Sequence, residues 1–379
     1  MPNGRFLQKT VWTLAALFLC SGQFSQGNLH ADITPTQIEL ESFGWQPPPP
    51  VHAREVDSVY SSQKITIDHQ GRVLVGFTVR EPGDELRKRS EPALSFRVVR
   101  LTKSDTPDLS LALPTNNWLG NGLYLDHSDH IVARANDQLQ LNLNDSEDTR
   151  QEKWKYLTSC GRVCDVVQSP TRRTLYIRRW DAGPPVTIVR TENPSDVKDC
   201  PSAPGYSPRS ITDNFAYFND NPGIPPMPPP IFYRWPLCDY ANRSRLPITT
   251  LEPIYPFDDD SFFGFGSGDI VVYGADGVVK RKIRMISAKH EGCGNPLRMS
   301  EKGDRVVVAC ATQRGGSRML DISSHLVAQR VVVYDVATGE LLASIAVPPL
   351  SLFPQLAISP DGHRIAVLVK DTVTVADIP

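Results

Sequence analysis

Five consecutive residues, Asp126 to His130, combine two carboxylates with two imidazoles, the side chains that bind zinc or transfer protons in many proteins. A structural zinc site needs a full set of ligands, and no second group of ligands stands at a suitable spacing. Asp and Ser side chains also satisfy the backbone of tight turns. The segment therefore predicts a polar turn, and neither a metal site nor a cofactor is predicted.

Catalytic motifs are missing elsewhere in the sequence. The aspartates at 258 to 260 resemble the start of a calcium loop, but the alternating ligands and the final Glu of that loop are absent. No Gly-x-Ser-x-Gly elbow, Walker loop or dinucleotide fingerprint occurs. No catalytic residue is predicted. The alternative to a non-catalytic protein is a propeller hydrolase or lyase, whose carboxylates would come from several distant strands and converge on a central channel.

The cysteines after the N-terminal segment indicate disulfides. Cys160 and Cys164 have a spacing that zinc sites also use, but no second close pair of Cys or His residues follows them. If Met299 lies opposite Arg305 across the turn between them, Cys293 and Cys310 fall nearly opposite each other on adjacent strands. A Cys293–Cys310 disulfide is therefore predicted. The pairing of the other four is left open: Cys160, Cys164, Cys200 and Cys238.

The N-terminus has the three parts of a secretory signal. Arg5 and Lys9 precede the apolar run VWTLAALFLC, and small residues follow around Gly27. The run is shorter than the roughly 20 residues that span a bilayer. Residues 1–27 are therefore predicted to be a signal peptide without a transmembrane segment, and the protein is predicted to be exported to the periplasm or the cell exterior.

The rest of the chain repeats one pattern, a short apolar strand, a turn of polar residues or Gly, and a second apolar strand. LAI-SPDGHR-IAVLV is the clearest copy, and LRM-SEKGDR-VVVAC and LYL-DHSDH-IVARA are others. The copies begin near residues 65, 123, 166, 209, 255, 297 and 356. Most are about 42 to 46 residues apart, which is the length of a four-stranded β-propeller blade.

VVVYDVATGELLASI followed by LAISPDGHRIAVL resembles the WD40-like propeller repeats of bacterial exported proteins, with Tyr334-Asp335 where those repeats carry Trp-Asp. The whole chain resembles a family of uncharacterised exported proteins from acidobacteria. The resemblance implies a propeller fold and no activity. The Gly-His dipeptide of eukaryotic WD40 repeats is absent. Ala343 replaces the Trp that ends the docking motif of propeller quinoproteins, so quinone binding is not expected.

These observations predict an all-β protein with a single propeller of seven four-stranded blades. Residues 36–42 alternate as a strand and are predicted to complete the last blade, which lacks a fourth strand of its own. Residues 28–58 would then hold this strand and a Pro-rich linker, and residues 59–379 would form the propeller. A monomer is expected.

Two blades carry long insertions between their second and third strands, at 81–93 and 312–328. Insertions gathered on one face of a repeat protein often mark its binding face. We therefore predict a non-catalytic binding scaffold whose partner is a protein, peptide or glycan. The net charge of −2 argues against nucleic acid. The predicted contacts are Arg87, Lys88, Arg89, Arg314, Arg318 and His325.

Overall fold

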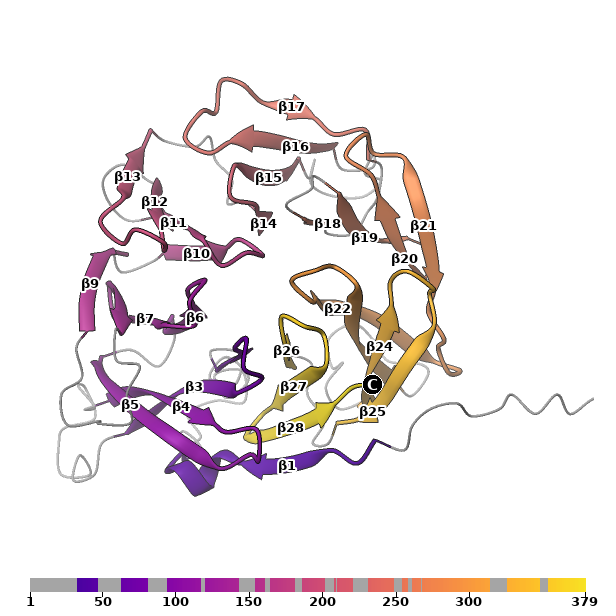
Figure 1. The fold of residues 1–379 in the computed structure, drawn as a ribbon, viewed down its shortest axis with the longest axis horizontal. Helices are drawn as coiled ribbons and strands as arrows, with labels where there is room; N and C mark the ends of the chain where they lie inside the picture. The colour runs from indigo at the N-terminus through magenta and orange to yellow at the C-terminus, as the bar shows by residue number, and fades with distance from the viewer. Residues whose placement is uncertain are drawn as a thin grey trace, which may run out of the picture.

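The computed structural model is a ring of seven β-sheets around a central axis (Figure 1). Within the part of the chain that it describes, no helix is long and apolar enough to cross a membrane. The described residues are 33–46, 63–80, 94–116, 120–142, 154–160, 164–180, 186–201, 208, 210–220, 231–248, 254–257, 261–266, 268–313, 326–347 and 354–379.

Each sheet is a four-stranded antiparallel blade, and the first strand of each blade lies innermost. Blades 1 to 3 consist of β2 (Lys64–Ile67), β3 (Val73–Arg80), β4 (Leu94–Leu101) and β5 (Pro107–Thr115); β6 (Gly122–Leu125), β7 (Ile131–Ala135), β8 (Gln138–Asn142) and β9 (Trp154–Ser159); and β10 (Cys164–Gln168), β11 (Thr174–Arg179), β12 (Val186–Arg190) and β13 (Val197–Cys200).

Blades 4 to 6 consist of β14 (Ser210–Ile211), β15 (Phe215–Asp220), β16 (Ile231–Pro236) and β17 (Ser244–Arg245); β18 (Ile254–Pro256), β19 (Phe262–Gly266), β20 (Asp269–Tyr273) and β21 (Val279–Arg284); and β22 (Glu291–Met299), β23 (Arg305–Gln313), β24 (Leu326–Asp335) and β25 (Leu341–Ala346). Blade 7 contains β26 (Gln355–Ile358), β27 (Arg364–Val369) and β28 (Thr372–Asp377), and β1 (Thr36–Glu39) is its fourth strand.

The predicted ring closure by an N-terminal strand is confirmed. β1 pairs antiparallel with β28, with Thr36 opposite Val375 and Glu39 opposite Thr372 (Figure 1). The strand is shorter than the predicted 36–42, because a 3-10 helix (Leu40–Phe43) replaces its last residues. This turn buries Leu40 completely and leaves Trp45 only 2% exposed, which a straight strand along the rim could not do.

Burial explains why the strands differ in composition. β3 reads VLVGFTV with every side chain buried, because neighbouring blades cover both faces of a second strand. β5, the outer strand of the same blade, alternates between exposed and buried side chains over PDLSLALPT. Seven clusters of buried side chains lie between the described parts of neighbouring blades, and they hold the ring together.

The structure pairs the six cysteines that follow the N-terminal segment. Cys293 is bonded to Cys310 across β22 and β23, the pairing that the strand register predicts. The assumed register was wrong by one residue at the turn, because Met299 faces Val306 instead of Arg305, and an irregularity between Gly294 and Leu297 restores the alignment. Cys160 is bonded to Cys164, and the Cys200–Cys238 disulfide joins blade 3 to the chain that follows β16 in blade 4.

Candidate functional site in the central channel

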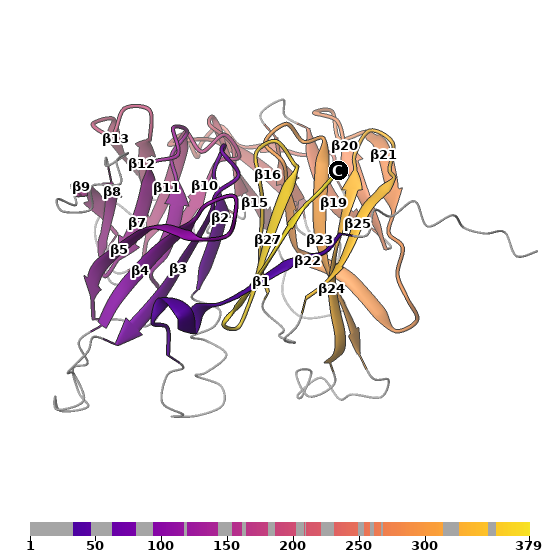
Figure 2. The same cartoon turned by 60° about the horizontal axis from the view of Figure 1, so that its bottom comes forward.

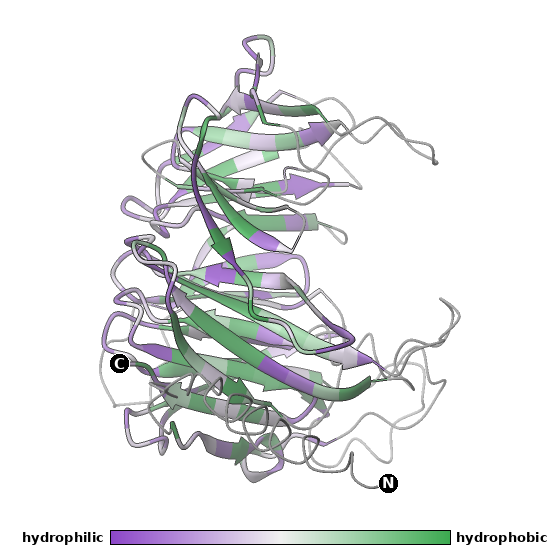
Figure 3. Cartoon of the chain, turned by 90° about the vertical axis from the view of Figure 1, so that its right-hand side faces the viewer, coloured by the Kyte–Doolittle hydropathy of each residue, from purple (hydrophilic) through white to green (hydrophobic). Residues whose placement is uncertain are grey.

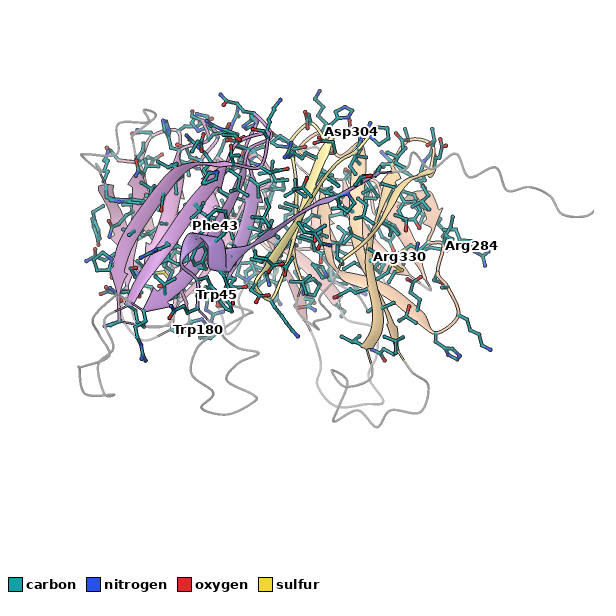
Figure 4. All side chains as sticks on the ribbon, turned by 90° about the horizontal axis from the view of Figure 1, so that it is seen from below. Phe43, Trp45, Trp180, Arg284, Asp304 and Arg330 are labelled. Carbon is teal, nitrogen blue, oxygen red and sulfur yellow. A yellow bond between two sulfur atoms is a disulfide. The ribbon has the colours of Figure 1, made fainter. Side chains whose placement is uncertain are left out.

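The two faces of the ring carry different connections. Turns between first and second strands, such as 68–72 and 300–304, lie on one face, which we call the turn face. Second strands lead to third strands on the opposite face, which we call the loop face. Figure 4 shows the two faces edge-on, with Asp304 on the turn face and Trp180 on the loop face.

A cavity of about 520 Å³ occupies the axis of the ring. All seven innermost strands contribute to its wall, so it is the central channel of the propeller. Its charged lining residues are Lys64, Arg172, Arg298 and Glu301. Glu301 is the single acid among them, and the described lining is therefore predominantly cationic.

A cluster of charged side chains lies at the turn-face end of this channel. His69 is its centre, with Nδ1 2.8 Å from Asp129 Oδ1 and Nε2 2.9 Å from Glu301 Oε2. Arg172 donates from Nη1 to the same oxygen of Asp129 at 3.1 Å, and from Nη2 to the carbonyl oxygen of Ile67 at 2.7 Å. We call His69, Asp129, Arg172 and Glu301 the mouth cluster.

The mouth cluster joins blades that are not neighbours. Arg172 reaches from blade 3 past blade 2 to the Ile67 carbonyl of blade 1. His69 of blade 1 binds Glu301 of blade 6, and blade 7 lies between these two. Each of these contacts passes the inner end of the blade that lies between its two partners. The cluster therefore braces the channel mouth from side to side, in addition to the packing between adjacent blades.

Two cluster residues occupy a backbone position that favours glycine. The fourth turn residue is left-handed in every five-residue turn described in full: φ is 76° at Gly71, 69° at Gly303 and 79° at Gly362. Blades 2 and 3 place Asp129 (66°) and Arg172 (62°) there instead. A side chain in this conformation costs about 1–2 kcal/mol relative to glycine. The ion pairs of the cluster offset that strain.

The geometry of the cluster stabilises the imidazolium form of His69. Both ring nitrogens face carboxylate oxygens, which only accept hydrogen bonds, so the two contacts together need a proton on each nitrogen. Burial opposes this charge, but the hydrogen bond to Asp129 and its negative charge outweigh burial and raise the pKa of His69. Burial likewise lowers the pKa of Arg172, against the attraction of Asp129.

Deeper in the channel, Arg298 on β22 is exposed to the lumen. Its Nη1 donates to the carbonyl oxygen of Leu297 at 2.8 Å, and no carboxylate among the described residues pairs with it. The blades surround the side chain, so its charge is poorly solvated and its pKa is lowered. Lys64 on β2 also lines the channel, and burial, followed by the charges of Arg298 and Arg134, lowers its pKa.

The sequence identified only part of this arrangement. The predicted turn at Asp126 is confirmed, because Asp126 Oδ1 accepts the backbone N–H groups of Ser128 and His130, each at 2.8 Å. The role of Asp129 outside its own turn was missed. Arg298 and Lys64 were missed too, although each is a charged residue beside apolar residues of a first strand, in LRM and KITI.

The six predicted binding residues at 81–93 and 312–328 lie outside the described residues, as do the aspartates at 258 to 260. The strands that flank the two insertions are described. β3 ends and β4 begins on the loop face, and so do β23 and β24 (Figure 2). The binding role of Arg87, Lys88, Arg89, Arg314, Arg318 and His325 stays a prediction.

No family model matches the sequence, and no curated protein matches it. Among solved structures, one that is similar is the Kuenenia stuttgartiensis hydrazine synthase, with 15% identity and a TM-score of 0.40. The match covers 66% of this chain and 76% of that chain. This likeness is too distant to carry any argument about function.

Proposed function

We propose that this protein is an exported, non-catalytic binding propeller whose central channel takes a small anion, a carboxylate or a phosphate. The observation that carries the proposal is Arg298, a guanidinium in the channel without an acidic partner among the described residues. A guanidinium binds a carboxylate or phosphate through two parallel hydrogen bonds. Because the blades shield it from bulk water, such a bond gains strength there.

Two further features support an anion at this position. Lys64 adds a second cation to the same cavity. Burial and, after it, the positive charge of Arg298 lower the pKa of Lys64, so an anion between the two cations would relieve their repulsion. Glu301, the acid that lines the cavity, is already bound to His69. Since the mouth cluster lies at the turn-face end, the proposed route of entry is the loop face.

The mouth cluster gives little support to the hydrolase or lyase alternative. General acid–base catalysis needs a proton or a lone pair directed at the substrate. Both ring nitrogens of His69 are engaged by carboxylates, and Asp129 holds Arg172 as well. The group is therefore arranged as a brace, and binding without catalysis is the function that the geometry supports best.

Export, a monomeric state and membership of a WD40-like bacterial propeller family belong to the same proposal. Disulfides persist in oxidising compartments outside the cytosol, and the three disulfides support export. A protein, peptide or glycan partner on the loop face would present its own carboxylate or phosphate to the channel.

Titration calorimetry at low salt tests the channel site, with inorganic phosphate and succinate as probes. The wild-type protein should bind at least one of them, and Arg298→Gln should lose that binding by about tenfold or more, the range for a charged hydrogen bond. Lys302→Gln is the matched control, because Lys302 is exposed on the nearby turn. Equal affinity in wild type and Arg298→Gln would refute the channel site.

A further inference from the structure

The outermost strand of blade 5 and the residues around it carry an unusual concentration of positive charge. No Asp or Glu occurs from residue 277 to residue 290, although acidic residues outnumber basic ones in the whole chain, 42 to 40. The same stretch contains five cations, which we call the basic rim. They are Lys280, Arg281, Lys282, Arg284 and Lys289.

All five side chains of the basic rim are exposed, and none of them pairs with an acid within the described part of the chain. The acid placed across from the strand is Asp269, whose backbone aligns with that of Arg284, and the two side chains form no ion pair. Figure 4 shows Arg284 projecting away from the ring. Asp276, in the turn before the strand, approaches the end of Lys280 without forming an ion pair. The cations of the basic rim therefore face solvent without a paired acid among the described residues.

Exposed apolar side chains flank these cations at both ends of the strand. Val278 is 61% exposed and Val279 44% exposed where the chain enters β21, and Ile286 is 57% exposed just after it ends. These are three of the seven large hydrophobic residues that are exposed in the described structure. Figure 3 looks onto this side of the ring and shows hydrophilic and hydrophobic segments alternating along its strands.

The position of β21 makes this surface available to a large, flat partner. β21 is the last strand of its sheet, and its outer edge pairs with no other described strand. The strand is about 20 Å long at 3.3 Å per residue. Basic residues on such an edge also discourage pairing with another chain, but that role does not need exposed valines and isoleucine beside them.

We propose that the basic rim docks onto an anionic lipid bilayer. Cations near a membrane are attracted to acidic headgroups, and neighbouring apolar side chains enter the boundary between headgroups and acyl chains. The combination of both kinds of side chain on one edge fits a bilayer better than a soluble polyanion, which would need only the cations. The basic rim is separate from the channel, so bilayer docking and anion binding in the channel can be tested independently.

Vesicle co-sedimentation tests the docking. Wild-type protein should bind vesicles that mix phosphatidylcholine with phosphatidylglycerol, and should ignore pure phosphatidylcholine. The triple variant Lys280→Gln, Arg281→Gln and Lys282→Gln should bind about a hundredfold more weakly, from the usual contribution of each cation near a charged surface. The matched control neutralises three exposed lysines on other blades: Lys155→Gln, Lys198→Gln and Lys302→Gln.

If the control variant loses as much vesicle affinity as the basic-rim variant, the proposal is wrong, because net charge alone would then explain binding. A second triple variant, Val278→Ser, Val279→Ser and Ile286→Ser, should lose the binding that persists in high salt. If this variant binds vesicles in high salt as well as the wild type does, and heparin competes fully with the vesicles, the partner is a soluble polyanion and the bilayer proposal is wrong. Hydrogen exchange of the wild type adds a test that needs no variant: vesicles should protect residues 279–286, and protection elsewhere alone would refute the proposal.

Discussion

His69 and Glu301 are 232 positions apart in the sequence, yet His69 Nε2 lies 2.9 Å from Glu301 Oε2 across the mouth of the channel. Asp129 holds the other ring nitrogen at 2.8 Å. The His69–Glu301 contact links blade 1 to blade 6 through side chains alone, without hydrogen bonds between their strands. Its strength depends on a titratable group, so the ring should respond to pH.

We expect the mouth cluster to stabilise the ring most in mild acid. The pKa of His69 is raised in the folded protein, so its contribution is complete below the unfolded value of about 6.5 and is lost as the pH rises through the folded value. Thermal unfolding of wild type and His69→Gln should therefore differ most near pH 6 and converge in alkali. A constant difference across this range would contradict the role of the imidazolium.

Arg172 offers a test of the left-handed turn position. Arg172→Met loses the bonds to Asp129 and Ile67 but keeps the strained conformation, whereas Arg172→Gly loses the same bonds and relieves the strain. Denaturant unfolding should show the Gly variant to be more stable than the Met variant by about 1 kcal/mol. At Arg173, where no left-handed φ occurs, Gly should have no such advantage over Met.

Lys64 should make anion binding in the channel dependent on pH. Burial, followed by the charges of Arg298 and Arg134, lowers its pKa below the ordinary value of 10.5. Affinity for the phosphate or succinate probe should therefore fall as the pH is raised towards that value. Calorimetry on Lys64→Arg should give a flat profile over the same range, because the guanidinium stays charged. A wild-type profile as flat as that of the variant would refute the involvement of Lys64.

The disulfides should contribute unequally to stability. Cys200 and Cys238 are separated by 38 residues, and Cys160 and Cys164 by only 4. Chain entropy then predicts a loss of about 4 kcal/mol for the first pair and about 2 kcal/mol for the second when each pair is replaced by Ala. Chemical denaturation measures both, and an equal loss would show that local packing, not loop closure, sets the values.

The fold could be predicted from the sequence because it depends on local patterns. A strand, a turn and a second strand are encoded within about 20 consecutive residues, and their recurrence gives the blade count. The closing strand at 36–39 was predictable by counting strands, but the 3-10 turn after it depends on burying Trp45 in a distant interface. No local sequence pattern indicates that Trp45 must be buried there.

The channel site was not predictable in the same way. His69, Asp129, Arg172 and Glu301 come from four different blades, and each occupies a turn whose composition is ordinary. Their side chains meet only because the ring places those turns around one axis. Asp129 and Arg172 carried the available signal: each stands where the equivalent turns have glycine, which a comparison of the repeats with each other would reveal.

The pairing of Thr36 with Val375 has a consequence for how the protein is made. β1 is synthesised before any blade, and its partner β28 is synthesised after all of them. Blade 7 therefore cannot be completed until residues at both ends of this pairing are present. A chain interrupted before residue 372 would present the outer edge of β27 to other molecules, which is a template for aggregation. The closing contact joins residues more than 330 positions apart, and pairings of such high sequence separation make folding slow.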